Sequence, residues 1–128
     1  MRDSTAKDLR LLRGTLIYIE DIEQTLNRFG RDYETFYHDR VFFNAISMCL
    51  MQIGEYTVGN SGFSEEFKEK NSGKVDWKRL RDLRNMFAHS YSTMNERQIY
   101  RMATEYIPVY KEFCMYAVTE LRKNNNLY

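Results

Sequence analysis

Residues 9–29, LRLLRGTLIYIEDIEQTLNRF, decide the fold class, because their apolar side chains recur at steps of three and four. Such spacing is typical of an amphipathic helix, and it aligns on one side seven apolar residues: Leu9, Leu12, Leu16, Ile19, Ile22, Leu26 and Phe29. We expect Ser4 and Thr5 to cap the start of this helix and Gly30 to end it.

A second helix is expected from about Asp39 to about Gly59. Its buried side carries six residues at helical spacing: Phe42, Ala45, Ile46, Cys49, Leu50 and Ile53. Met48 and Met51 widen this apolar surface, which indicates a helix deep in the bundle or at a subunit contact.

Two polar segments that contain glycine, residues 59–62 and 71–73, interrupt the helical pattern. Between them, residues 64–70 predict a short exposed helix. After the second break, Asp76 is expected to cap a helix that ends close to His89.

The last helix is expected to start after Asn95, which can form a capping pair with Gln98. Its apolar positions are Ile99, Met102, Tyr106, Val109, Phe113, Ala117 and Leu121. Pro108 lies inside this pattern, so the helix should kink there, because proline removes a backbone donor and crowds the preceding turn.

The sequence shows neither the alternation of apolar and polar residues that is typical of β-strands nor an internal repeat. It therefore predicts an all-α antiparallel bundle of four main helices plus one short helix. A chain of 128 residues supports a single domain over residues 1–128, and its asparagine-rich end, residues 123–128, is expected to be a frayed tail.

Composition limits the function. The formal net charge of +1 gives no general attraction for nucleic acid or membranes, so polyanion binding would require a local patch. A charged fraction of 29% and a mean hydropathy of −0.64 exclude a membrane protein. Without an apolar leader, and with Cys49 and Cys114 read as reduced thiols, the protein is expected to be cytoplasmic.

Several catalytic patterns are missing from the sequence. Residues 59–62, GNSG, lack the lysine that follows a phosphate-binding loop. The two histidines and two cysteines lack the spacing of metal ligands on a helix, and there is no Gly-x-Ser-x-Gly nucleophile motif. We therefore expect neither a metal nor another cofactor.

The remaining candidate is a basic segment. Residues 74–84 hold five lysines and arginines against two aspartates, a local charge of +3. The segment leads into residues 84–91, RNMFAHSY, a polar cluster at the end of a helix. Lys78 and Arg81 within it are candidate substrate-binding residues.

Asn85 and His89 are four residues apart and share a helix face, whereas Arg84 and His89 are separated by about 140° around a regular helix. One chain therefore need not bring all three side chains together. Two arrangements would: a helix that unwinds after Ala88, or a symmetric partner that supplies the second copy.

Arginine, histidine and an amide around a phosphate suit metal-free cleavage of RNA, in which the substrate's 2′-hydroxyl is the nucleophile. Histidine exchanges protons near neutral pH, so His89 can serve as acid or base. Arg84 can stabilise negative charge on the phosphate through two parallel hydrogen bonds. Asn85 could hold the phosphate or orient the imidazole.

Each residue also has a structural interpretation. Arg84 and His89 can be solvated surface residues, His89 at a helix C-terminus. His38 is expected at the surface before a helix, and Trp77 in the core. Glu55 is either the partner of a basic side chain or a supporting residue of the site.

Beyond these residues, the sequence resembles the HepT-like toxins, a branch of the HEPN superfamily of helical ribonucleases. Residues 84–91 resemble their Arg-x-x-x-x-His-x-Tyr motif. The similarity extends over about residues 8–120 and includes four further features: an Ile-Gly-Glu at 53–55, residues 64–67, residues 75–77 with their tryptophan, and Pro108.

The resemblance implies a HEPN bundle that forms a two-fold homodimer, with Arg84 and His89 of both chains facing one cleft. It also implies a toxin that cleaves RNA without a metal. Asn85, Arg81, Lys78 and Glu55 would support substrate binding.

The family's usual partner is an MntA-like nucleotidyltransferase, the antitoxin of a type VII toxin–antitoxin system, which attaches AMP to the motif tyrosine. Here that residue is Tyr91. A bulky anionic nucleotide beside His89 would occupy the phosphate site and pair with Arg84. The sequence departs from the family in having Ser90 where most members have glycine, a residue that tolerates left-handed backbone angles.

A binding role is the alternative. The chain could be a non-catalytic substrate-binding or regulatory subunit of a nucleotidyltransferase, whose basic segment holds the nucleotide. A helical dimer that has lost activity is a third possibility, and the intact Arg84 and His89 argue against it.

Overall fold

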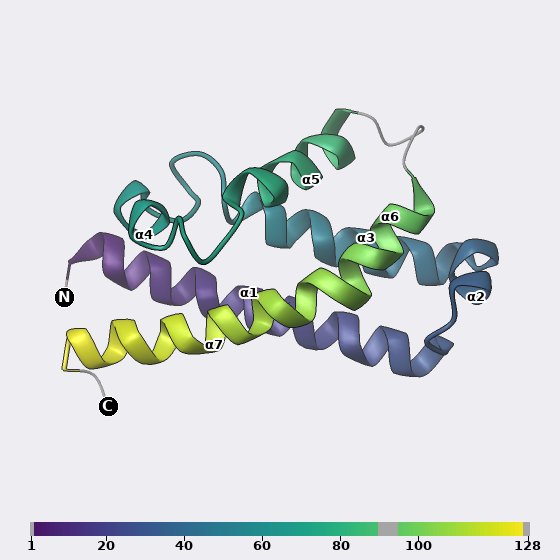
Figure 1. The fold of residues 1–128 in the computed structure, drawn as a ribbon, viewed down its shortest axis with the longest axis horizontal. Helices are drawn as coiled ribbons and strands as arrows, with labels where there is room; N and C mark the ends of the chain where they lie inside the picture. The colour runs from purple at the N-terminus through teal and green to yellow at the C-terminus, as the bar shows by residue number, and fades with distance from the viewer. Residues whose placement is uncertain (1, 90–94, 127–128) are drawn as a thin grey trace.

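The computed structural model describes residues 2–89 and 95–126, and most of these residues are helical (Figure 1). In chain order the elements are α1 (Asp3–Phe29), α2 (Tyr33–His38), α3 (Arg40–Glu55), α4 (Glu65–Lys70), α5 (Trp77–His89), α6 (Glu96–Arg101), the π-helical turn η2 (Met102–Tyr106) and α7 (Ile107–Asn124). The all-α prediction is confirmed.

The long helices form an antiparallel bundle. α1 packs against both α3 and α7, and α5 packs on the side of α3 (Figure 1). The N-terminus and the end of α7 lie at the same end of the bundle. Most residues of the predicted apolar stripes form one core or pack against it. Val109 is an exception: it was expected on the apolar side of the last helix but is 65% exposed, whereas Ile107 and Tyr110 are buried.

The boundaries of α1 differ from the prediction at its start. Ser4 and Thr5 lie inside the helix, and the residue before it, Arg2, makes no side-chain capping hydrogen bond. The capping prediction is therefore wrong, because the helix begins one residue before Ser4. Gly30 ends α1 with φ of 92°, as predicted.

The short helix α2 was not predicted, so the described residues contain a short helix in addition to α4 and to α6, which leads through η2 into α7. Asp32 caps α2 by accepting a hydrogen bond from the backbone N–H of Thr35, and Phe36 is fully buried. Six residues are too few for apolar periodicity to reveal a helix. His38, the last residue of α2, is exposed, as expected for a surface residue before a helix.

Asp39 caps α3 through hydrogen bonds from the N–H groups of Val41 and Phe42. The helix ends at Glu55, earlier than the predicted Gly59. Met48 is 55% exposed, so this part of α3 does not lie deep in the bundle of one chain.

The start of α5 is fixed at two points. The Asp76 carboxylate accepts a hydrogen bond from the N–H of Arg79 at 3.1 Å, which confirms the predicted cap. Trp77 donates from Nε1 to the carbonyl of Lys68 and packs against four aromatic rings: Phe63, Phe67, Tyr110 and Phe113. Trp77 thus anchors α5, as expected.

Asn95 accepts a hydrogen bond from the N–H of Gln98, which starts α6 as predicted. Further along, the disturbance expected from Pro108 takes the form of the π-helical turn η2. Proline would crowd the carbonyl four residues before it, that of Thr104, and cannot donate to it. The N–H of Ile107 instead reaches the carbonyl of Met102, five residues back, so the wider turn makes room for the ring.

Both cysteines are buried and unpaired. Burial raises the pKa of the Cys49 thiol to about 11 and that of Cys114 to about 12. Both thiols are therefore protonated at neutral pH and are core residues rather than nucleophiles.

α3 and α5 approach closely at Gly54. A Cβ atom there would lie 2.8 Å from the Cβ of Arg84 and 3.0 Å from the carbonyl oxygen of Leu80. Neither atom is the end of a flexible side chain, so only glycine permits this approach. The next residue, Glu55, is thereby brought to α5.

We predict that Gly54→Ala destabilises the protein. Separation of the two helices should cost about 1–3 kcal/mol, more than the gain in helix propensity of about 1 kcal/mol. Urea denaturation measures the change in the free energy of unfolding. Gly73→Ala is the control, because nothing lies within 4 Å of a Cβ at Gly73. Equal stability of the two variants would contradict the prediction.

Candidate active site

The candidate catalytic residues Arg84 and His89 both lie on α5, which remains helical through His89. The suggested unwinding after Ala88 is not observed. Five residues along a regular helix place the two side chains about 140° apart around its axis. Within one chain, Arg84 and His89 therefore point to different sides of α5.

Arg84 is held by two neighbours. Its Nε donates to the Glu55 carboxylate from α3, and one terminal nitrogen donates to the Asn85 side-chain oxygen at 3.1 Å. The Arg84 side chain is 31% exposed and that of Glu55 is 40% exposed. The structure thus brings Glu55, Arg84 and Asn85 together, and it confirms Glu55 as the partner of a basic side chain.

This arrangement fixes the plane of the guanidinium group but leaves part of it accessible. Arginine carries five N–H donors, and among the described residues Glu55 and Asn85 accept from two of those of Arg84. The remaining donors can bind a planar or tetrahedral anion such as a phosphate. The Arg84 site can therefore hold a phosphate without releasing Glu55.

His89 is the last residue of α5, and it is exposed. It shares a helix face with Asn85, four residues earlier. A histidine in such a position can exchange protons with a bound ligand.

The basic segment does not form one patch, because its charges point in several directions. Lys74 lies 4.0 Å above the ring of Tyr116, and Arg79 lies 4.6 Å above the ring of Tyr106. Lys78 and Asp82 form an ion pair at 2.6 Å, and this hydrogen bond lowers the pKa of the Asp82 carboxyl. Arg81 is exposed.

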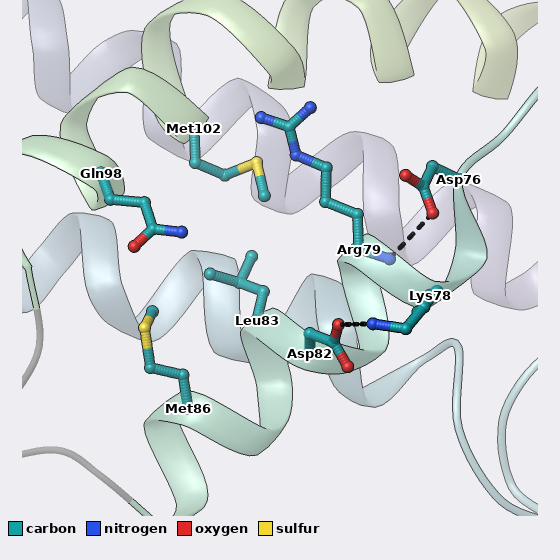
Figure 2. Close-up of a pocket in the computed structure, with 8 residues that line it drawn as sticks. All are labelled: Asp76, Lys78, Arg79, Asp82, Leu83, Met86, Gln98 and Met102. Atoms are coloured by element: carbon teal, nitrogen blue, oxygen red, sulfur yellow. Dashed lines mark hydrogen bonds and ion pairs between the residues drawn. The ribbon is translucent and has the colours of Figure 1, made fainter.

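A groove lies between α5 and α6, with a volume of about 460 Å³. We call it the α5–α6 groove, and it is lined by Asp76, Lys78, Arg79, Asp82, Leu83, Met86, Gln98 and Met102 (Figure 2). Lys78 was predicted near a substrate, whereas Gln98 and Met102 were predicted only as a capping residue and a residue of an apolar stripe. The sequence does not show which helix these two residues face, because that depends on the tertiary structure.

Two residues of the predicted motif, Ser90 and Tyr91, lie outside the described residues. Among residues 2–89 and 95–126, no group of three or more His, Cys, Asp or Glu side chains could hold a metal ion. Within the same residues, no helix has both the length and the apolar character needed to cross a membrane.

Comparison with known proteins gives one finding. The family model described as "Ribonuclease HepT-like" matches residues 15–117, which include α3 and α5 and therefore Glu55, Arg84 and His89. No curated protein and no solved structure gives a significant match.

Proposed function

Because the chain belongs to the HepT-like ribonuclease family, a toxin family of the HEPN superfamily, we propose that it is the toxin of a type VII toxin–antitoxin system. In this proposal it is a cytoplasmic endoribonuclease that cleaves RNA without a metal. One observation carries the assignment to these residues: α5 presents an arginine oriented by Glu55 and an exposed histidine.

The angle between the two side chains supports a composite site. A second copy related by a two-fold axis would place its Arg84 opposite the first copy's His89. Each cleft would then hold both residue types, although they diverge on one helix. The homodimer is thus part of the proposed mechanism, because one chain leaves the site incomplete.

The reaction needs only proton transfer and charge stabilisation. The 2′-hydroxyl attacks the adjacent phosphorus, and the bond to the 5′-oxygen of the next nucleotide breaks. His89 accepts the hydroxyl proton, and the imidazolium that this forms donates a proton to the departing oxygen. Arg84 stabilises the negative charge on the phosphate. The products are a 2′,3′-cyclic phosphate and a 5′-hydroxyl.

We also propose that an MntA-like nucleotidyltransferase neutralises the toxin by transferring AMP to Tyr91. Tyr91 follows His89 by two residues, so the attached phosphate would remain near the catalytic histidine. The accessible donors of Arg84 could pair with that phosphate. A nucleotide bound in this way would exclude the RNA.

A non-catalytic role is the second candidate. Glu55 compensates the charge of Arg84, which is compatible with a regulatory subunit that binds a nucleotide and performs no chemistry. The two functions differ in whether the purified protein alone cleaves RNA.

We predict that the purified protein cleaves single-stranded RNA in EDTA and leaves 2′,3′-cyclic phosphate ends. His89→Ala should reduce the rate by about 10²–10⁴-fold, because proton transfer is lost. Gel analysis of end-labelled RNA measures the rate. His38→Ala is the control, since His38 is also exposed at a helix end and should not matter. Cleavage by His89→Ala at the wild-type rate would refute the enzyme assignment.

A further prediction concerns Tyr91. Coexpression with the nucleotidyltransferase should add an adenylyl mass to the peptide that contains Tyr91, as measured by mass spectrometry. Tyr91→Phe should carry no such mass and should stay toxic. An inactivated toxin with unmodified Tyr91 would show that the partner acts by binding alone.

A further inference from the structure

The α5–α6 groove continues into a strongly basic hollow. This hollow has a volume of about 410 Å³ and shares Arg79 and Gln98 with the groove. Its other lining residues are Asn95, Arg97 and Arg101. Every charged residue that lines it, within the described part of the chain, is an arginine. We call Arg79, Arg97 and Arg101 the arginine cluster.

The arginine cluster is held in place without losing its capacity for anions. Arg79 lies 4.6 Å above the ring of Tyr106, and Arg97 lies 4.1 Å above that of Tyr33. A guanidinium group stacked in this way keeps its in-plane N–H donors available. Arg101 donates from Nε to the Glu105 carboxylate at 3.0 Å, and within the described residues no hydrogen bond occupies its terminal nitrogens. Three oriented guanidinium groups suit a phosphate.

The groove beside the cluster has a different character. Met86 is partly exposed and, with the largely buried Leu83 and Met102, lines the groove with apolar side chains; Figure 2 shows the Gln98 amide and the two thioether groups directed into the same space. Within the described residues no hydrogen bond occupies the Gln98 side-chain amide, and the helix cap uses the backbone N–H of this residue. An apolar lining with a nearby amide suits an unpaired nucleobase, which has an apolar face and a hydrogen-bonding edge.

The candidate catalytic histidine does not line the groove, but it lies on the same side of α5. Asp82 lines the groove, and His89 lies seven residues later on α5, which places it within about 20° of Asp82 around the helix. Met86 lies between them, about one turn before His89. A strand with its phosphate at His89 can therefore follow α5 into the groove, whereas Arg84 faces α3.

We propose that the α5–α6 groove binds the single-stranded RNA that adjoins the cleaved phosphate. One base lies against Met86 and Met102 with its edge at Gln98, and a neighbouring phosphate binds the arginine cluster. The inference rests on the proposed ribonuclease function and names how its substrate is held outside the catalytic residues.

The test uses a fluorescent single-stranded oligoribonucleotide that is fully 2′-O-methylated, because it cannot be cleaved. Fluorescence anisotropy gives its Kd at potassium chloride concentrations from about 50 mM to about 200 mM. For the double variant Arg97→Ala/Arg101→Ala we expect about tenfold weaker binding at low salt. The slope of log Kd against log salt should fall by about 1.4, or about 0.7 for each lost contact to a single strand.

Two variants serve as controls. Arg10→Ala/Arg13→Ala removes the same charge from exposed positions of α1 outside the groove, and it should bind like the wild type. Arg97→Lys/Arg101→Lys keeps the charge and should keep the slope. Thermal unfolding of each variant confirms that it is folded.

If Arg97→Ala/Arg101→Ala bound the oligoribonucleotide with the affinity and the salt dependence of the wild type, the groove proposal would be overturned. Loss of binding to a protein partner in this variant would not rescue it. An equal loss in the α1 control would do the same, because the effect would then be one of net charge. Cleavage of unmodified RNA by the wild type is scored separately. Binding that depends on the arginine cluster without any cleavage would refute the ribonuclease function and leave the groove proposal standing.

Discussion

The close approach of α3 and α5 at Gly54 is the constraint on which the site depends. It brings Glu55 to Arg84, and the resulting ion pair fixes the guanidinium group before any ligand arrives. A flexible arginine would lose side-chain entropy on binding a phosphate, whereas an oriented one has already lost it on folding. His89 remains exposed at the end of α5. The same helix therefore carries both Arg84, which is held by Glu55, and the candidate proton-transfer residue His89.

The contacts of α5 also bear on how a chain of nearly zero net charge would bind the proposed polyanion. Three of the four lysines and arginines of α5 have separate partners: Glu55 binds Arg84, Asp82 binds Lys78, and the ring of Tyr106 contacts Arg79. Of these three, Arg79 belongs to the arginine cluster, which lies beside the α5–α6 groove. The relevant charge is therefore set by the packing of α5 against α6 and not by the basic segment alone.

Much of the fold could be predicted because apolar spacing and capping residues are local signals. The helices around Ile19, Ile46, Leu83 and Phe113 were expected, and the caps at Asp76 and Asn95 are confirmed. The short helix α2 was not predicted, since six residues give no apolar periodicity. At Pro108 a kink was predicted, whereas the structure has a π-helical turn before the proline. For the site, helical spacing predicted the divergence of Arg84 and His89. It could not predict which partner each cation of α5 would find, because these contacts join residues distant in sequence.

The central claim is that the catalytic site is completed by two copies of the chain. The most direct measurement is a complementation assay in which Arg84→Ala and His89→Ala protomers are refolded together and assayed for RNA cleavage. A composite site predicts that the mixture cleaves RNA clearly faster than either variant alone, because one intact arginine and one intact histidine meet across the interface. A mixture as inactive as its two components would contradict the account.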